Sequence, residues 1–297
     1  MKKLDFSVLI VTYNSNRFLP HCISSIFCQD ILPREIYVVD NNSKAKPSAV
    51  VEELKATARK KGVKVSYLEN KENLGYARAV NLAIPRLSGS WVLVLNPDVR
   101  IGKTALSQVF KFLKNREEKI LAIGGKAFSW GTKKVVPNIA KKPNFLTLLF
   151  EFTSLKKIFP SFFLSNSFWD KRIFEANDPF PADMISGSFI FLNKKNFLFL
   201  GGFDENFFLY LEDLDLGMRA RSGGYELYCL PSVTMEHYGG GSSAYEKGKI
   251  SQQAWDYSKR YFSKKWFSWR GSVLVFIFGL DDLLIKIKKL LGKIVAK

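Results

Sequence analysis

Residues 6–43 decide the fold, and they read FSVLIVTYNSNRFLPHCISSIFCQDILPREIYVVDNNS. The first seven positions form a short run rich in Val and Ile, which is typical of a strand buried on both faces. Between positions 18 and 27, apolar residues recur at intervals of three and four. This spacing predicts a helix with Asn14 or Ser15 as its N-cap. A second apolar run at 35–39 completes a strand–helix–strand unit.

The same alternation continues along the first half of the chain. It predicts helices at 48–61, 75–87 and around 106–113, and strands at 64–68, 91–95 and 120–123. Strands and helices that alternate at these intervals form a doubly wound, mostly parallel α/β sheet with helices on both faces. Such a sheet binds ligands outside the carboxyl ends of its strands. We therefore expect functional residues directly after Val11, Val39, Leu68 and Leu95.

The second half of the chain is less regular. From about residue 130 to 181, Phe, Pro and Lys are mixed without a clean period, so we expect a mobile or acceptor-facing segment there. Order returns at 183–192 and in a helix around 212–221, which Gly223 and Gly224 close.

The tail differs from the rest of the chain. Its apolar residues fall at helical spacing, with lysines beside them: Val273, Phe276, Ile277, Leu280, Leu283, Leu284, Ile287, Leu290, Leu291 and Ile294, with Lys286, Lys288, Lys289, Lys293 and Lys297. A basic amphipathic helix lies in a membrane interface, and the alternative is a helix packed on the catalytic domain or on a second subunit. We expect a domain at 1–248, divided into halves at 1–125 and 126–248, for which the resemblance described below implies nucleotide-binding and acceptor roles respectively. A basic amphipathic extension at 249–297 follows it.

The composition limits the class of protein. With 297 residues, 47% of them hydrophobic, the chain is long enough for one large α/β domain with an appendage. The formal net charge of +18 indicates an anionic partner, such as nucleic acid, acidic lipid or a phosphorylated small molecule, although solubility alone also explains it. Many of the 26 Phe cluster between Phe145 and Phe208, which suggests apolar surface beyond the needs of one core, part of it facing lipid.

Few features of the sequence indicate in which cellular compartment the protein lies. The three cysteines form no CxxC pair, so we expect neither a disulfide framework nor a zinc site, in keeping with a reducing cytoplasm. The first apolar run stops at Val11 without a cleavage-site pattern, so we expect no signal peptide. The longest apolar run, 273–280, is far shorter than the roughly 20 residues that span a bilayer. We expect a cytoplasmic protein, peripheral on the inner face of the cell membrane.

Polar residues follow each of the first two strands. After the first strand come Thr12, Tyr13 and Asn14, without the G-x-G-x-x-G of dinucleotide-binding folds, and the chain has no Walker-type phosphate loop. NAD-dependent enzymes and P-loop NTPases are thereby disfavoured. Asp40 and Asn42 follow the second strand. A carboxylate there accepts hydrogen bonds from a nucleotide base or ribose, and the alternative is a local Asx turn.

The third and fourth strand ends carry candidates for the phosphate and the metal. Asn73 and Gly75 follow the third strand, and Gly75 permits close approach of the backbone. Arg78 and Asn81 share one face of the following helix, where Arg78 either grips a diphosphate or stays solvated.

The fourth strand ends at Asn96-Pro97-Asp98. The carboxylate of Asp98 suits a hard divalent cation shared with substrate phosphates, and the alternative is a Pro-Asp turn.

Two further candidate sites lie in the second half of the chain, one with three acidic residues and one with a histidine. Glu212, Asp213 and Asp215 open the helix predicted at 212–221, where they either interact with the helix dipole or hold a general base. His237 is one of two histidines and precedes a Gly-rich, Ser-containing loop at 239–243, whose backbone could fold over phosphates. A lone histidine is more often structural, so both readings stay open.

In this order, the motifs resemble those of glycosyltransferase family 2, the inverting enzymes of GT-A fold, and most closely its rhamnosyltransferase-like branch. The likeness covers roughly residues 6 to 245 and rests on Val11-Thr12-Tyr13-Asn14, Val38-Val39-Asp40-Asn41-Asn42-Ser43, Asn73-x-Gly75 with Asn81, Asn96-Pro97-Asp98, Gly201-Gly202-Phe203-Asp204-Glu205, Tyr210-x-Glu212-Asp213-x-Asp215-Leu216 with Arg219, and His237-x-Gly239. The tail lies outside it.

The resemblance implies a role for each matching position. Asp40 would read the base, with Thr12, Tyr13, Asn14 and Asn42 around the nucleoside, and Asn73, Gly75, Arg78, Asn81 and Asn96 would complete the donor site. Asp98 and His237 would hold Mg²⁺ or Mn²⁺ on the diphosphate. Asp213, paired with Glu212, would be the catalytic base. Many members have Asp-x-Asp where this chain has Asn96-Pro97-Asp98, so only one carboxylate is left for the metal.

The resemblance therefore implies a metal-dependent, inverting transfer of a sugar from a nucleotide-sugar donor. The branch suggests dTDP-rhamnose, with UDP-sugars as the alternative. A saccharide or polyprenyl-diphosphate-linked saccharide would be the acceptor, in the synthesis of cell-surface polysaccharide, and the tail would bind an anionic membrane. A sugar-nucleotide-binding relative without activity is a further alternative. A basic nucleic-acid-binding protein also explains the charge, but acids at the strand ends would repel phosphates, so we expect no nucleic acid partner.

Overall fold

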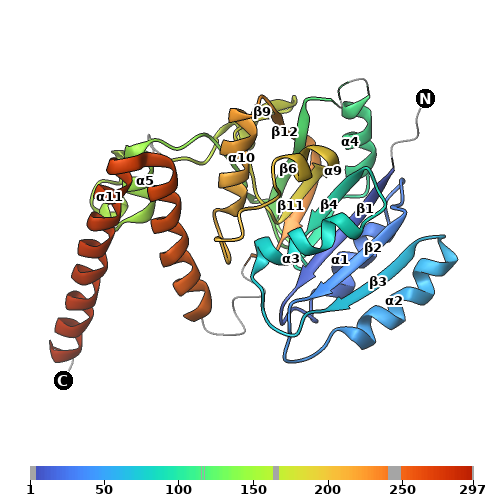
Figure 1. Ribbon diagram of the computed structural model, residues 1–297, viewed down its shortest axis with the longest axis horizontal. Coiled ribbons are helices and arrows are strands. Elements are labelled where there is room, and N and C mark those ends of the chain that lie inside the picture. The colour runs from blue at the N-terminus through green and yellow to red at the C-terminus, as the bar shows by residue number, and fades with distance from the viewer. Residues whose placement is uncertain (1–4, 115, 117, 163–166, 240–248, 296–297) are drawn as a thin grey trace.

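The computed structural model describes residues 5–114, 116, 118–162, 167–239 and 249–295 (Figure 1). Its centre is a twisted sheet in which strands follow the order β3-β2-β1-β4-β11-β6-β12-β5. The first four run parallel: β3 (Lys64–Glu69), β2 (Glu35–Asp40), β1 (Phe6–Thr12) and β4 (Trp91–Leu95). The predicted α/β class and these four strands are confirmed, with boundaries correct to about one residue.

The other half of the sheet is mixed. β11 (Phe189–Asn193) is antiparallel to both β4 and β6 (Ile120–Ser129), whereas β6 and β12 (Glu226–His237) run parallel. β5 (Val99–Ile101) lies antiparallel beside β12 at the edge. The strand predicted at 120–123 is therefore longer than expected, because β12 pairs with it along its whole length.

Helices cover both faces of the sheet, as predicted. Alternate residues of β1 separate the two sides: Phe6, Val8 and Ile10 join one buried cluster, and Leu9 and Val11 join the other. The first cluster is covered by α1 (Leu19–Phe27), α2 (Ser48–Lys60) and α4 (Ala105–Leu113). The second is covered by α3 (Tyr76–Ala83), the 3₁₀ turn η1 (Ile84–Arg86), α9 (Lys194–Phe199) and α10 (Glu212–Ser222).

The predicted N-cap of α1 is wrong. The N-cap position is Phe18, and no side chain caps it. Asn14, at a φ of 51°, instead accepts a hydrogen bond from the backbone N–H of Lys44 at 2.8 Å, and its own N–H donates to the Ser43 hydroxyl at 2.8 Å. The side chain therefore joins the loop after β1 to the loop after β2.

The segment from 130 to 181 is more ordered than expected. It contains short strands at β7 (Val135–Val136), β8 (Ile139–Ala140) and β9 (Phe180–Ala182), with β10 (Met184–Ile185) just after it, and helices α5 (Phe145–Phe152), α6 (Leu155–Ile158) and α8 (Arg172–Glu175). Many of the clustered Phe side chains are buried, including Phe189, Phe191 and Phe197, and others such as Phe159 and Phe162 are exposed.

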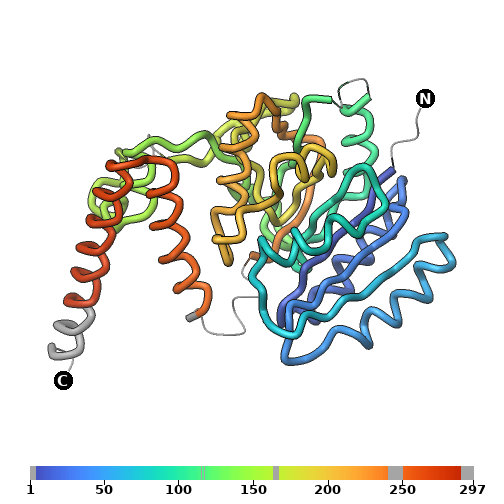
Figure 2. The backbone as a smooth tube through the Cα atoms, in the orientation of Figure 1, coloured from blue at the N-terminus to red at the C-terminus, as the bar shows by residue number. Residues whose placement is uncertain are grey.

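The tail forms one long helical element, α11 (Lys249–Val295), which bends at Ser268, where φ is 50° and ψ is −131°. Figure 2 shows its two arms as a hairpin beside α5, at the opposite end of the molecule from β3 and α2. Both arms contribute to a third core: Phe262, Leu274 and Phe278 pack with residues of α5 and α10. The boundary predicted at 248 falls outside the described residues. No helix among those described is long and apolar enough to cross a membrane.

Candidate active site

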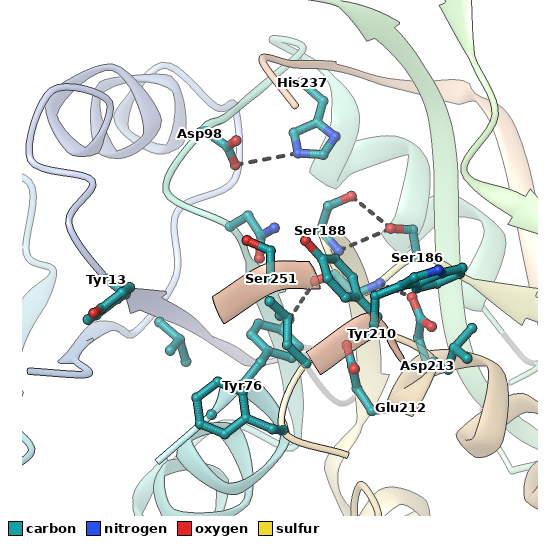
Figure 3. A pocket seen from close by; sticks show the side chains of 18 of the residues that line it. Tyr13, Tyr76, Asp98, Ser186, Ser188, Tyr210, Glu212, Asp213, His237 and Ser251 are labelled. Atoms are coloured by element: carbon teal, nitrogen blue, oxygen red, sulfur yellow. Dashed lines mark hydrogen bonds and ion pairs between the residues drawn. The ribbon is translucent and has the colours of Figure 1, made fainter. Parts of the chain in front are cut away.

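A cavity of about 410 Å³ opens at the carboxyl ends of the parallel strands. Its wall takes residues from the ends of β1, β3 and β4 and from the loop after β2, and it also takes residues from the turn before α10, from the end of β12 and from the helical tail. Figure 3 shows these side chains converging from both halves of the chain. The members that the argument uses are Tyr13, Asn41, Asn73, Gly75, Asn96, Asp98, Glu151, Trp169, Gly187, Glu212, Asp213, His237, Ser251 and Trp255.

Asn41 joins the loops after β2 and β3 where they line this cavity. Its amide nitrogen donates to Asn73 Oδ1 at 2.8 Å and to the Gly75 carbonyl at 3.1 Å, and its oxygen accepts from the backbone of Leu74 at 3.0 Å. The ends of β2 and β3 are thereby tied together. The sequence did not single out Asn41 as a site residue, although it stands inside the matching motif. The Asp-Asn-Asn-Ser run at 40–43 is also typical of a local turn, so nothing distinguishes Asn41 from its neighbours.

Gly75 is required by packing. Its φ is +80°, and a Cβ there would lie 2.5 Å from the Phe208 carbonyl oxygen. That carbonyl accepts a hydrogen bond from the Tyr76 backbone at 2.7 Å. A side chain at position 75 would therefore separate α3 from the segment that leads into α10.

The five donor residues predicted at the ends of β1 and β2 occupy different places. Tyr13 lines the cavity, whereas Asp40, Asn14 and Asn42 are not part of its described lining. The Asp40 side chain is fully buried and accepts a hydrogen bond from the Ser43 backbone at 3.0 Å, with the Lys46 ammonium 3.7 Å away. Here Asp40 closes the local turn, and its role at a nucleotide base stays a prediction.

Thr12 is likewise not part of the described lining of the cavity. Thr12 is buried and its hydroxyl finds no hydrogen-bond partner among the described residues. Asn42 has a φ of 66° and accepts a hydrogen bond from Lys46 at 3.1 Å.

Arg78 and Asn81 share one helix face, as predicted, but neither is part of the described cavity lining, and both contact the turn at 203–205. Asn81 clamps the backbone of Phe203 by donating at 2.8 Å and accepting at 2.9 Å. A Cβ on Gly202 would lie 2.5 Å from the Asn81 amide oxygen, which explains the glycine there. Arg78 is 59% exposed and pairs with Glu205 at 3.7 Å. The structure therefore gives no support to a diphosphate contact for either residue.

Asp98 and His237 face each other across the top of the cavity (Figure 3). The antiparallel pairing of β12 with β5 sets His237 opposite Val99 and so beside Asp98. His237 Nε2 lies 3.4 Å from Asp98 Oδ1, with the two side chains 24% and 4% exposed. In the described part of the chain, no group of three or more His, Cys, Asp or Glu residues is arranged so that it could hold a metal ion. This donor set, one carboxylate and one imidazole, fits a divalent cation that takes its remaining ligands from substrate oxygens and water.

A strained turn presents the carboxylate pair Glu212–Asp213. Tyr210 and Leu211 both have positive φ, at 71° and 67°, and α10 begins directly after them. Left-handed backbone at a non-glycine residue costs on the order of 1–3 kcal/mol and persists only where the surroundings impose it. Asp213 Oδ2 then accepts a hydrogen bond from the Gly187 backbone at 3.0 Å, and Oδ1 accepts from the Leu214 backbone at 2.8 Å.

The environments of the two carboxyls differ. Burial raises the pKa of Glu212 well above its ordinary value, and the neighbouring charges of Asp213 and Asp215 raise it further. Burial also raises the pKa of Asp213, but the N–H groups of Gly187 and Leu214 oppose this by stabilising the ionised form. Two adjacent buried carboxylates do not both ionise readily. The two backbone N–H groups therefore favour the ionised form of Asp213, whereas burial favours the neutral form of both carboxyls.

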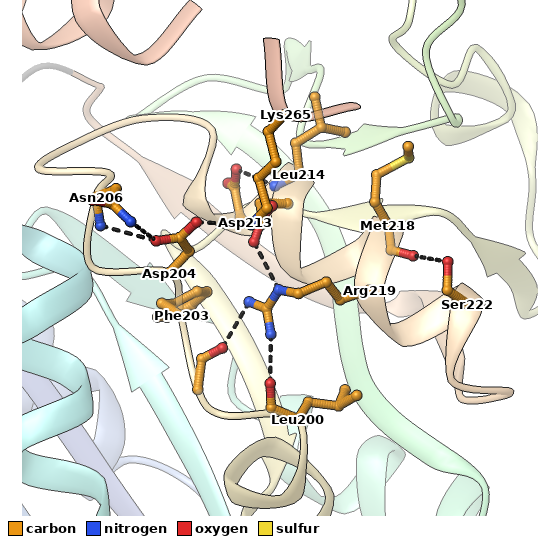
Figure 4. A network of polar contacts seen from close by, with 12 residues as sticks. Leu200, Phe203, Asp204, Asn206, Asp213, Leu214, Met218, Arg219, Ser222 and Lys265 are labelled. Atoms are coloured by element: carbon orange, nitrogen blue, oxygen red, sulfur yellow. Dashed lines mark hydrogen bonds and ion pairs between the residues drawn. The ribbon is translucent and has the colours of Figure 1, made fainter. Parts of the chain in front are cut away.

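A buried network fixes the position of α10. Asp215 is fully buried and accepts a hydrogen bond from Arg219 at 2.7 Å and one from the Trp266 indole at 2.9 Å, and Lys265 pairs with it at 2.6 Å. Arg219 also donates to the carbonyls of Leu200 and Gly202 (Figure 4). Because Trp266 and Lys265 belong to α11, the tail helps to hold the helix that presents Asp213.

Sequence reasoning missed the wall of the cavity that comes from the helical tail and its surroundings. Glu151 of α5, Trp169, and Ser251 and Trp255 of α11 line it. No periodic signal marks these positions, because they come together only through the third core.

Comparison with known proteins identifies the family. The family model described as Glycosyl transferase family 2 matches residues 7–174. The N-acetylglucosaminyl-diphospho-decaprenol L-rhamnosyltransferase of Mycobacterium tuberculosis is 26% identical over 245 residues, which cover 78% of this chain and 75% of that protein.

Solved structures share the fold at low identity. The structure of GalNAc-T7 with UDP, GalNAc and Mn²⁺ superimposes with a TM-score of 0.59 at 14% identity, over 80% of this chain and 44% of that one. The mannosyltransferase PcManGT of Pyrobaculum calidifontis, in complex with GDP-Man and Mn²⁺, gives 0.54 at 15% identity, over 97% and 80%. These likenesses confirm the GT-A fold. The chain belongs to glycosyltransferase family 2.

Proposed function

We propose that this family 2 glycosyltransferase moves a sugar, with inversion, from a nucleoside-diphosphate donor to a lipid-linked saccharide. The observation that carries the proposal is that Asp98, His237 and the Glu212–Asp213 pair line the same cavity. Rhamnose from dTDP-rhamnose is the donor that we favour, because the M. tuberculosis relative is an L-rhamnosyltransferase. That relative is also named for an N-acetylglucosaminyl-diphospho-decaprenol acceptor, which suggests the same acceptor class here.

Asp213 is the proposed general base. Its carboxylate would accept the proton of the acceptor hydroxyl as that oxygen attacks the anomeric carbon. The new C–O bond forms on the face opposite the leaving group, the bond to the diphosphate oxygen breaks, and the configuration inverts. The backbone N–H groups of Gly187 and Leu214 hold the carboxylate in one orientation, which favours proton transfer along one direction.

Asp98 and His237 are the proposed ligands of Mg²⁺ or Mn²⁺. Among the described residues, the cavity wall contains no Lys or Arg, so the chain itself offers little positive charge to a diphosphate. A bound divalent cation would supply that charge beside the departing oxygen. The two ligands are set by a strand pairing, so they need no rearrangement to meet the same ion. The Gly-rich loop at 240–243 lies outside the described residues, and its predicted role stays a prediction.

A donor panel tests the function. Purified protein would receive dTDP-rhamnose, UDP-N-acetylglucosamine, UDP-glucose or GDP-mannose with Mg²⁺ or Mn²⁺, and N-acetylglucosamine linked by a diphosphate to a short prenyl chain as acceptor. We expect acceptor-dependent release of nucleoside diphosphate from dTDP-rhamnose. Release from UDP-sugars alone would correct the donor, and no release from any donor would refute the proposal.

The second arm of α11 is the proposed membrane contact. After Ser268, one stripe of large apolar side chains is exposed: Trp269, Val273, Phe276, Leu280, Leu283, Leu284 and Ile287. The exposed Lys286 and Lys288 add positive charge beside it. An apolar stripe flanked by lysines is suited to the interface of an anionic membrane.

Surface substitutions are the right test, because Leu274 and Phe278 on the same arm belong to the third core and deletion of the tail would disturb it. We expect Trp269→Ser with Phe276→Ser to abolish sedimentation with vesicles of phosphatidylglycerol and to leave the Tm unchanged. Unchanged sedimentation would refute the membrane contact.

A further inference from the structure

One wall of the cavity has no part in the mechanism above. It is formed by Glu151 of α5, Trp169, and Trp255 of α11, together with Ser251. These side chains lie near the third core, in which the helical tail packs against α5 and α10. The wall proposed to bind the donor, by contrast, is built from residues at the strand ends.

One carboxyl oxygen of Glu151 has no hydrogen-bond partner among the described residues. This atom, Oε2, is buried. Burial raises the pKa of this carboxyl, against the opposing charge of Lys156. The side chain as a whole is only half-buried and lines the cavity, so its carboxyl group can accept a hydrogen bond from a ligand in the cavity.

Two tryptophans that line the cavity together with Glu151 pack against other aromatic rings. The Trp255 ring packs edge-on against Phe152 at a centroid distance of 5.1 Å and against Tyr210 at 5.8 Å. The Trp169 ring packs on Phe168 at 4.7 Å. Both indoles are half-buried and still line the cavity, so each presents apolar ring surface to a ligand. Apolar ring surface and a carboxyl group in the wall of one cavity match a pyranose, which has C–H groups on its faces and hydroxyls around its edge.

We propose that Glu151, Trp169 and Trp255 form the subsite for the acceptor sugar, in which Glu151 accepts a hydrogen bond from a ring hydroxyl or amide N–H of that sugar. This inference rests on the proposed function and assigns its acceptor to one wall of the cavity. Glu151 is a positioning residue: it orients the acceptor so that another hydroxyl points at Asp213. The Tyr210 hydroxyl, which hydrogen-bonds Ser251, ties this wall to the turn that precedes Asp213.

Substitution of Glu151 by Met tests the subsite, because Met has similar length and no strong hydrogen-bonding atom. The matched control is Glu175→Met, which changes an exposed glutamate of α8 that is not part of the cavity wall. The acceptor is N-acetylglucosamine linked by a diphosphate to a short prenyl chain, and a series of its monodeoxy analogues is assayed beside it. Donor affinity is measured separately by calorimetry.

We expect Glu151→Met to raise the acceptor KM at least tenfold, with kcat changed less, donor affinity unchanged and the Tm unchanged or higher. With the unmodified protein, one monodeoxy analogue should have a kcat/KM about tenfold below that of the intact acceptor. With Glu151→Met, this analogue and the intact acceptor should have the same kcat/KM. Glu175→Met should behave as the unmodified protein does.

An unchanged acceptor KM, or a lowered Tm with no effect of any deoxy analogue, would overturn the subsite while leaving the transferase intact. Absence of nucleoside diphosphate release by the unmodified protein would overturn the proposed function, and the subsite with it.

Discussion

Asp213→Asn is the substitution that tests the proposed base most directly. The asparagine side chain has nearly the same shape, but it takes no proton from an acceptor hydroxyl. General-base assistance contributes about 10²–10⁴-fold to a rate, and each factor of ten corresponds to about 1.36 kcal/mol. We therefore expect the turnover rate to fall by at least about 100-fold, which is a loss of about 2.7 kcal/mol of transition-state stabilisation.

The structure also predicts a cost in stability. Both Asp213 oxygens accept backbone hydrogen bonds, at 3.0 Å from Gly187 and 2.8 Å from Leu214. Asparagine keeps one oxygen and replaces the other by an NH₂ group, so one of the two N–H groups loses its acceptor. An unsatisfied buried donor costs about 1–3 kcal/mol. The variant should remain folded with a lower Tm, and donor affinity should be retained because Asp213 belongs to the acceptor side of the mechanism.

Glu212→Gln is the matched control. Burial and the charges of Asp213 and Asp215 raise the Glu212 pKa well above its ordinary value, and glutamine keeps the shape of this side chain while it removes the ionisable group. We expect only a small change in rate or stability. Stopped-flow release of nucleoside diphosphate at saturating donor and acceptor measures the rates, and calorimetry measures donor affinity. Near-normal turnover by Asp213→Asn, or a larger loss for Glu212→Gln, would refute the assignment of the base.

Three further predictions follow from the same geometry. Asp98→Ala and His237→Ala should each raise the Mn²⁺ concentration needed for half-maximal activity by at least about tenfold, and equal Mn²⁺ dependence in all three proteins would exclude a shared ion. Asp215→Ala should lower the free energy of unfolding by about 3–5 kcal/mol in urea titration, because it leaves Arg219 and Lys265 without their buried partner, and a change below 1 kcal/mol would contradict the network. As the pH falls, kcat/KM should decrease at a pH above 3.8, the ordinary pKa of aspartate. The reason is that the pKa of Asp213 is raised, so this base becomes protonated, and therefore inactive, at a higher pH than an ordinary aspartate. An acid limb at or below 3.8 would argue against Asp213.

Local patterns in the sequence were sufficient for the parallel half of the sheet and the helices between its strands, but they did not predict β5 or β12. The strands at β1 to β4 were predicted because a buried strand needs a short run of Val, Ile and Leu, and this signal depends only on neighbours in the chain. The N-cap of α1 was mispredicted for the opposite reason. The Asn14 side chain bonds to Lys44, a residue of another loop, and no local pattern reports such a contact.

The same division applies to the candidate site. Topology alone brings strand ends to one edge of a parallel sheet, so Tyr13, Asn73, Asn96 and Asp98 could be expected around one cavity. The direction in which Arg78 and Asn81 point could not be expected, because it depends on the turn at 201–205 that packs against α3.

The sequence by itself determined the fold class, the family resemblance and the types of residue at the strand ends, since these are encoded in short periodic runs and ordered motifs. Only the tertiary structure decided which of them meet. His237 reaches Asp98 through the β5–β12 pairing, and Glu151, Trp169 and Trp255 form one wall because the third core packs α5 and α11 together. Contacts between segments far apart in the chain arise from packing of the whole molecule, and no local pattern of residues specifies them.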